Sequence, residues 1–186
     1  VTMDAVWLER SKRLADYTFS YFFDEEKHMF YFTSKEDAKL MTRTFEYRDN
    51  VIPASNSIMA KNLFKLSHYF DKPKYGETSK QMLKNVLPEL EQYPSGFSNW
   101  MDLLRNYQSK YFEVVVVGPE AEEQIAALHT YYIPNMLIAG STTQQDGYLL
   151  EGRFVEGETY IYVCVNNTCK LPVKEVEKAI ETIKNF

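Results

Sequence analysis

Apolar residues recur at helical spacing through most of the first 110 residues, so that each segment has one apolar face. Short turns that contain proline separate the later segments, and proline resists continuation of a helix from the residue before it. Amphipathic helices joined by such turns pack as antiparallel hairpins. A short extended piece is expected over residues 29–33. The segments with helical spacing are residues 4–24, 58–70, 75–90 and 98–107.

The pattern changes near residue 111. A continuous β-branched run, Val114 to Val117, predicts a strand that is covered on both faces. A helical pattern and a second apolar run follow, and strand–helix–strand spacing predicts a parallel crossover. A third strand is expected at 160–165 and a closing helix at 173–183. The predicted fold class is therefore α+β: a helical part, residues 1–110, followed by a small three-layer-like α/β unit, residues 111–186, with a short, mainly parallel sheet.

A polar, non-periodic stretch at residues 47–57 leads directly into an apolar helix. Ser55, Asn56 and Ser57 can each accept a hydrogen bond from the unpaired amides of the first helical turn. The residues alone therefore favour an ordinary capped helix start. The same loop offers Asp49 as the best carboxylate for acid–base catalysis, because a loop entering a buried helix can desolvate a carboxylate. A solvated loop charge or a helix cap is the favoured alternative for Asp49.

Two cysteines, Cys164 and Cys169, stand with four residues between them. Two thiols so placed can share a disulfide or supply half of a zinc site, but zinc needs two further ligands. The three histidines are scattered, and no Cys-x-x-Cys opens a helix, so structural thiols are favoured over a catalytic pair. The first strand–helix turn lacks the Gly-x-Gly-x-x-Gly spacing of dinucleotide sites. We therefore expect no metal and no cofactor.

Charge and hydropathy narrow the set of partners. The formal net charge of −5 argues against nucleic acid or an anionic membrane surface, which require clustered Lys and Arg. No apolar run reaches the roughly 20 residues of a membrane span, and the N-terminus lacks the layout of a secretion signal. A cytoplasmic location is expected. Aromatic residues make up 15% of the chain, which suits either a sugar-binding cleft or a thick core, and the core is favoured.

Several motifs in one order resemble the YyaL and spermatogenesis-associated protein 20 family. Residues 48–57 and the following helix are similar to the Asp-Gly-x-x-Pro-Ser-x-Asn-Ser segment of that family, although Asn50 replaces its Gly and Ala54-Ser55 replaces its Ser-Gly. Residues 113–118, 132–135 and 162–173 resemble its C-terminal part, so that the match covers nearly the whole chain.

The resemblance implies a larger parent protein. That family joins an N-terminal thioredoxin-like domain to an (α/α)6 toroid similar to N-acylglucosamine 2-epimerases, with a small α/β unit at the end. This chain would then be a C-terminal fragment holding the last toroid helices. Its exposed helix faces would pair with the N-terminal remainder of the parent or with another copy of the chain.

The implied function has two versions. In the first, the parent binds or isomerises a carbohydrate-like ligand, with Asp49 as a catalytic residue and Asn50, Asn56 and Ser57 as ligand contacts. The histidines that act as acid and base in sugar epimerases have no counterparts here, and the fragment alone would be inactive. In the second, the chain is a non-catalytic interaction or scaffold module attached to a thioredoxin-like domain. Thiol chemistry at the cysteine pair is a third, weaker hypothesis.

Overall fold

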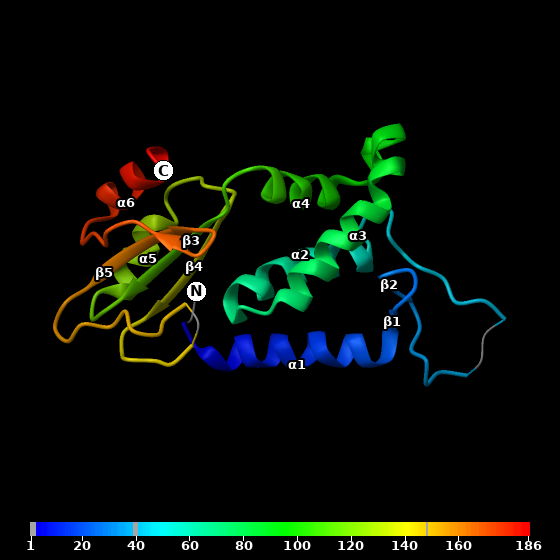
Figure 1. Ribbon diagram of the computed structural model, residues 1–186, viewed down its shortest axis with the longest axis horizontal. Coiled ribbons are helices and arrows are strands. Elements are labelled where there is room, and N and C mark those ends of the chain that lie inside the picture. The colour runs from blue at the N-terminus through cyan, green and yellow to red at the C-terminus, as the bar shows by residue number, and fades with distance from the viewer. Residues whose placement is uncertain (1–2, 39–40, 148) are drawn as a thin grey trace. The chain divides into compact units, whose positions relative to one another are not determined.

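A computed structural model describes residues 3–38, 41–147 and 149–186 of the chain. It divides into two compact units, a helical unit, Asp4–Arg105, and a sheet unit, Asn106–Phe186, to which Met3 also belongs (Figure 1). Both helices and strands are present, which confirms the mixed α and β composition predicted from the sequence.

The helical unit begins with a helix of 18 residues. The side chain of Asp4 accepts a hydrogen bond from the Val6 amide at 2.9 Å and caps the first helix. Pro73 occupies the first position of the third helix, where its missing N–H costs nothing, so this helix starts two residues earlier than its apolar pattern suggests. The elements are α1 (Ala5–Phe22), β1 (Phe23–Asp24), β2 (Met29–Phe30), α2 (Ser55–Phe70), α3 (Pro73–Gln92), the 3-10 turn η1 (Pro94–Gly96) and α4 (Ser98–Gln108), which runs across the unit boundary.

Helices α2 and α3 form the centre of the helical unit as a hairpin. Asp71 closes α2 in the left-handed conformation, with φ of 44°, and its N–H donates to the Ser67 carbonyl. The Ser79 hydroxyl ties the two helices together by donating to the Ala60 carbonyl at 2.7 Å. The fully buried apolar side chains of α2 and α3 include Leu63, Tyr75 and Met82.

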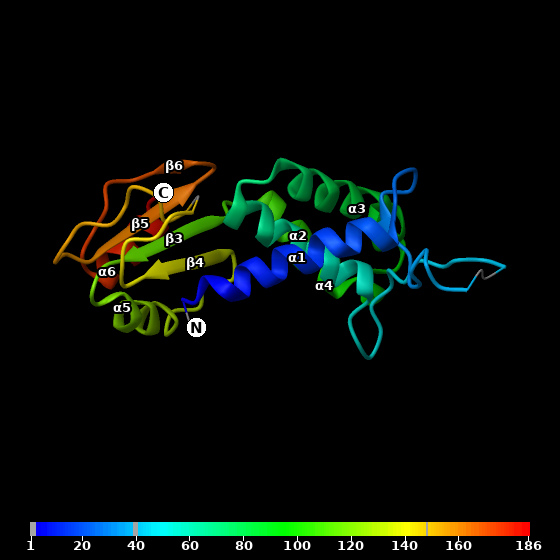
Figure 2. The ribbon, with the colours of Figure 1, turned by 90° about the horizontal axis from the view of Figure 1, so that it is seen from below.

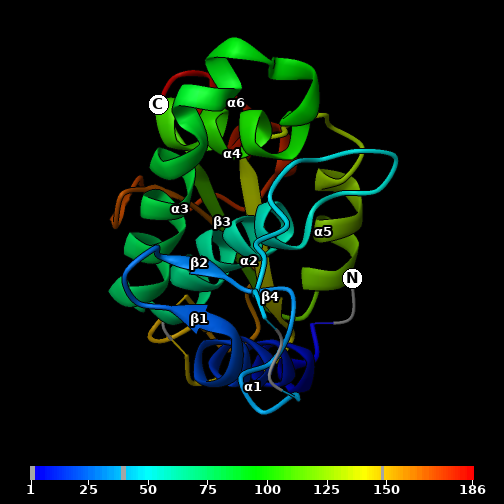
Figure 3. The same ribbon diagram turned by 90° about the vertical axis from the view of Figure 1, so that its right-hand side faces the viewer.

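A short β-hairpin, with two residues in each strand, follows α1 (Figure 3). Phe23 pairs with Phe30 and Asp24 with Met29 in antiparallel register. Asp24 fixes the turn between the two strands, because its carboxylate accepts hydrogen bonds from the backbone amides of Glu26 and Lys27 at 2.9 and 2.8 Å. The extended piece predicted over residues 29–33 is therefore present but only two residues long.

The sheet unit contains a four-stranded sheet in the order β4-β3-β5-β6 (Figure 2). The predicted parallel pairing of β3 with β4 is confirmed, whereas β3 pairs antiparallel with β5, and β5 with β6. The sheet is thus mixed, and the expectation of a mainly parallel sheet is wrong. The elements are β3 (Phe112–Val117), α5 (Ala121–Leu128), β4 (Met136–Ser141), β5 (Tyr160–Val165), β6 (Thr168–Cys169) and α6 (Val176–Lys184).

Both helices of the sheet unit pack on the same face of the sheet. Alternate residues of β3 and β5, such as Val114 and Val163, share one buried cluster with Ile125 of α5 and Ile180 of α6. The unit therefore has two layers of regular structure, in place of the three-layer arrangement expected from the sequence. The prediction for β3 itself is confirmed, because all six of its residues are buried.

Candidate functional site

The loop that the sequence singled out connects three parts of the helical unit. The Asp49 amide donates to the Gly96 carbonyl at 2.8 Å, which joins the loop to η1. Arg48 contributes a second attachment through Nη2, which lies 2.6 Å from the Glu89 carboxylate of α3. Arg48 and Asp49 are therefore both held to other elements of the helical unit.

Asp49 lies at the centre of this loop and is 8% exposed. Its Oδ1 accepts hydrogen bonds from the Ala54 amide at 3.0 Å, the Ser57 hydroxyl at 2.6 Å and Asn99 Nδ2 at 3.2 Å. Its Oδ2 accepts from the Asn99 amide at 2.9 Å. The carboxylate thus satisfies amides at the start of both α2 and α4, which is the role of a capping group.

Asn56 is fully buried, and its side chain forms hydrogen bonds to segments that are distant in sequence. Its Nδ2 donates to the Phe30 and Glu46 carbonyls at 2.8 and 2.9 Å, and its Oδ1 accepts from the Phe30 amide at 2.8 Å. The side chain forms three hydrogen bonds and pairs with both backbone groups of a β2 residue. This arrangement joins the start of α2 to the β1–β2 hairpin.

The four predicted site residues divide into an internal group and one outward residue. Ser57 is fully buried, and its hydroxyl points to Asp49 and to the Ala54 carbonyl, which it contacts at 2.9 Å. Asn50 is exposed, and the apolar side chains of Val51 and Ile52 beside it are 96% and 69% exposed. The structure therefore brings Asp49 and Ser57 together, and it turns Asn50 toward solvent.

A tyrosine and an ion pair anchor the chain just before Asp49. The Tyr47 hydroxyl donates to Glu89 Oε1 at 3.0 Å, beside the Arg48 contact. The hydrogen bond from Arg48 holds the pKa of Glu89 below its ordinary value, while burial and the hydrogen bond to Glu89 raise the pKa of Tyr47. Glu89 therefore remains a charged anchor at neutral pH.

A second polar cluster, which the sequence pattern did not reveal, joins α1 to α3. Asp16 accepts hydrogen bonds from Tyr75, from Lys12 at 3.1 Å and from Lys72 at 3.1 Å. Burial by itself raises the pKa of Asp16, but the hydrogen bonds from Tyr75, Lys12 and Lys72 outweigh burial and lower this pKa to about 2. Burial and the bond to Asp16 raise the pKa of Tyr75. The contact between Asp16 and Tyr75 leaves no local signal in the sequence, because the two residues are 59 positions apart.

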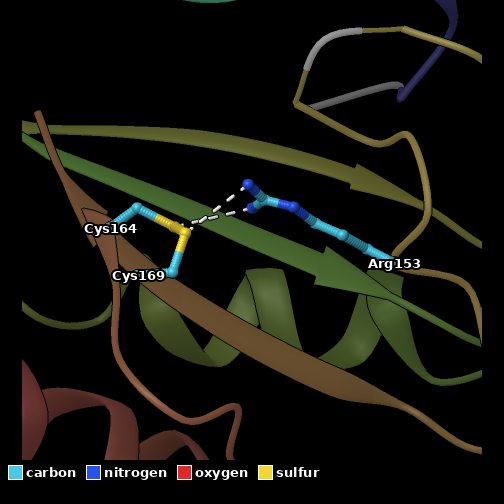
Figure 4. Close-up of a disulfide and its surroundings, with 3 residues drawn as sticks. All are labelled: Arg153, Cys164 and Cys169. Carbon is cyan, nitrogen blue, oxygen red and sulfur yellow. Dashed lines mark hydrogen bonds between the residues drawn. A yellow bond between two sulfur atoms is a disulfide. The ribbon is translucent and has the colours of Figure 1, made fainter. Parts of the chain in front are cut away.

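The two cysteines form a disulfide across the β5–β6 hairpin. Cys164 and Cys169 are direct partners in the strand register, and their sulfur atoms are 2.08 Å apart. The guanidinium of Arg153 lies 3.6 Å from each sulfur (Figure 4). Of the alternatives that the sequence left open, the structure adopts the disulfide and not half of a zinc site. Within the described residues, no group of three or more His, Cys, Asp or Glu is arranged to hold a metal ion.

Comparison with known proteins bears on the family resemblance. No family model matches the chain. Human spermatogenesis-associated protein 20 is 23% identical over an alignment of 186 residues, which covers 94% of this chain and 24% of the human protein. The chain is similar to spermatogenesis-associated protein 20. The mouse protein of that name gives the same identity and coverage, and an uncharacterized protein of Caenorhabditis elegans is 22% identical over 84% of this chain.

These similarities confirm the resemblance that the order of the sequence motifs predicted. The chain spans about a quarter of the length of the curated relatives it matches. Their names state no ligand and no reaction. In the ranges that the structure describes, no helix is both long and apolar enough to cross a membrane.

Proposed function

We propose that this chain is a non-catalytic interaction module of a longer polypeptide, and that the outward face of α1 is its docking surface. The observation that carries the proposal is that the polar candidate residues are mostly buried and hydrogen-bonded, while large apolar side chains of α1 are exposed. The polar atoms of Asp49, Asn56 and Ser57 are engaged in hydrogen bonds within the helical unit. Large apolar side chains of α1, in contrast, are left in solvent.

Helix α1 has 18 residues, and of these Ala15 is the buried one. Phe19 lies on the same side as Ala15 and stacks on Tyr75, with ring centroids 5.8 Å apart. We define the outward face of α1 as Val6, Trp7, Arg10, Arg13, Leu14 and Tyr17, which helical spacing places along one side. Trp7 and Leu14 are 54% and 64% exposed. A helix with apolar residues on both sides is typical of one covered on both sides.

The chemistry of this face points to an acidic amphipathic helix as its partner. Arg10 lies over the Trp7 ring at 4.9 Å, and Arg13 is also exposed, so that two cations stand among the apolar side chains. A helix with an aliphatic stripe flanked by carboxylates would bury the stripe and pair both arginines. We assign this helix to the same longer polypeptide, because the relatives carry about three quarters of their length outside the matched part.

Hydroxyl-radical footprinting with mass spectrometry tests this proposal. Trp7 should be oxidised rapidly in the 186-residue chain and at least about fivefold more slowly in the longer natural polypeptide, because the docked helix would exclude solvent from the ring. Leu14→Lys in the longer polypeptide should remove the protection. Val155→Lys is the matched control, because Val155 is an exposed apolar residue of the sheet unit and lies outside the outward face of α1.

Two outcomes would overturn the assignment. Equal oxidation of Trp7 in both proteins would mean that nothing covers the outward face of α1. Protection that rises with the concentration of the 186-residue chain, together with a dimer in sedimentation analysis, would identify the occupant as a second copy and not as a helix of the longer polypeptide.

Carbohydrate-like ligand binding by the longer polypeptide is a second candidate, favoured by the exposed Asn50 beside the apolar Val51 and Ile52. An amide next to apolar surface suits a sugar, which presents both hydroxyl groups and C–H faces. The test uses the longer polypeptide in D2O with aldoses and N-acyl hexosamines, with deuterium uptake beside the carbonyl followed by NMR. Uptake that is lost in Asn50→Ala, with folding retained, would support this candidate. Absence of uptake and of binding throughout would refute it.

A further inference from the structure

The β5–β6 hairpin gives its two cysteines unequal access to solvent. Asn166 and Asn167 form its two-residue turn with φ of 49° and 61°, the left-handed values of the turn type favoured in hairpins. This turn sets the register in which Cys164 faces Cys169. Cys164 is fully buried, whereas Cys169 is exposed on β6, an edge strand. Cys169 is therefore the half of the disulfide that is open to a thiolate from solvent.

Arg153 brings a positive charge to both sulfurs from a segment outside the hairpin. Its Nη1 lies 3.6 Å from the Cys164 sulfur and its Nη2 3.6 Å from the Cys169 sulfur. Tyr162 holds the arginine in two ways: its hydroxyl donates to the Arg153 carbonyl at 3.0 Å, and its ring lies 5.2 Å below the guanidinium. Figure 4 shows the guanidinium directed at the disulfide.

The Arg153 guanidinium interacts weakly with a disulfide sulfur and strongly with a thiolate. A disulfide sulfur is neutral and a weak acceptor, while a thiolate carries a full negative charge and is stabilised by a neighbouring arginine. The buried Glu113 lies directly opposite Cys164 on β3, so its side chain shares this face of the sheet, where a carboxylate would oppose a thiolate on Cys164. Arg153 offsets that opposition.

We infer that the Cys164–Cys169 pair is a thiol–disulfide exchange site that accepts electrons from dithiols, an activity independent of docking by α1. A dithiol thiolate attacks the Cys169 sulfur, the Cys164–Cys169 bond breaks, and Cys164 leaves as a thiolate beside Arg153. The second thiol of the reductant then attacks the mixed disulfide and releases Cys169. The protein disulfide gains two electrons and the two protons that the reductant loses, and the reductant becomes a disulfide.

The test measures native-state reduction of the 186-residue chain by dithiothreitol, with reduced glutathione and a thioredoxin-type protein dithiol as separate arms. Thiols are trapped by alkylation and counted by mass spectrometry while circular dichroism monitors the fold. Reduction should proceed in the folded protein. Arg153→Met should lower the equilibrium constant for reduction about tenfold, or ~30 mV in potential, because it removes the cation beside the thiolates.

Three variants separate the charge of Arg153 from other effects. Lys178→Met makes the same change in net charge on an exposed residue of α6 and should behave as the natural chain. Arg153→Lys keeps the charge and should recover part of the tenfold loss. In Cys164→Ser, Cys169 should be alkylated faster in the folded protein than in urea, which tests the effect of Arg153 without altering it.

Specific outcomes would overturn the inference. Reduction that occurs only where denaturant unfolds the sheet unit would make the disulfide purely structural. Equal equilibrium constants for Arg153→Met and Lys178→Met would show that the guanidinium does not act on the sulfurs. Faster reduction by the protein dithiol than by glutathione would support a site that accepts electrons from dithiols, whereas faster reduction by glutathione, which carries a single thiol, would overturn the assignment to dithiols.

Discussion

Replacing Asp49 with alanine should destabilise the helical unit by about 3 kcal/mol. The carboxylate accepts four hydrogen bonds, from the Ala54 amide, the Ser57 hydroxyl and two groups of Asn99. The Ser57 hydroxyl keeps the Ala54 carbonyl as an acceptor, so three donors lose their partner. A buried donor left unsatisfied costs about 1–3 kcal/mol, and partial access of water to a site that is 8% exposed places each loss near the lower limit.

Trp100 provides a local probe for this measurement. It follows Asn99 in α4, is fully buried, and donates from Nε1 to the Tyr47 carbonyl at 2.7 Å. Its fluorescence during urea denaturation reports on the helical unit, which avoids treating two units as one transition. Asp49→Asn keeps one acceptor oxygen and should cost about 1–2 kcal/mol. Asn50→Ala, at the exposed neighbouring position, should stay within about 0.5 kcal/mol of the natural chain.

A small effect of Asp49→Ala would refute this reasoning. If its free energy of unfolding stays within about 0.5 kcal/mol of the natural chain, the four hydrogen bonds contribute nothing net to the fold. The carboxylate would then be held for another purpose, and the catalytic assignment made from the sequence would become the better explanation.

Two further predictions concern Asp16 and Gly118. Asp16→Asn should lower stability at neutral pH, because the folded-state pKa of about 2 lies below the ordinary value of 3.8, and the difference from the natural chain should vanish as pH falls from about 4 through 2. Urea denaturation at several pH values measures this loss of stability. The prediction would be contradicted by a stability difference between Asp16→Asn and the natural chain that does not depend on pH. It would also be contradicted if Glu175→Gln, which removes a carboxylate from an exposed ion pair, lowered stability by as much. Gly118→Ala should cost about 3 kcal/mol or more, because φ is +136° and a Cβ would lie 2.2 Å from the Glu158 carbonyl oxygen. Thermal denaturation should show a much smaller loss for Gly152→Ala, where φ is +70° and no atom lies within 4 Å, and equal losses would rule out the clash.

The sequence determined features that depend on short-range interactions. Asp4 as a cap, the break before Pro73 and the apolar spacing of α2 and α3 involve residues within a few positions of each other. The helices cover the segments that these patterns predict, although α2 and α3 begin at Ser55 and Pro73, ahead of their apolar patterns. The strands β3, β4 and β5 follow from apolar runs of strand length for the same reason. The short polar residues Ser55, Asn56 and Ser57 also marked the start of α2. The expectation that they cap it is wrong, because they lie inside the first turn of α2 and the N-cap residue is Ala54.

Only the tertiary structure decided how these elements use their polar groups. The donors that surround Asp49 come from positions as far as 50 residues away, and Arg153 reaches the two cysteines from 11 and 16 residues away. The direction of β5 was likewise set by its partners, because a single apolar run suits parallel and antiparallel pairing equally. Hydrogen bonds and charge pairs between distant residues leave no periodic trace in a sequence, since they depend on where the chain returns after each turn.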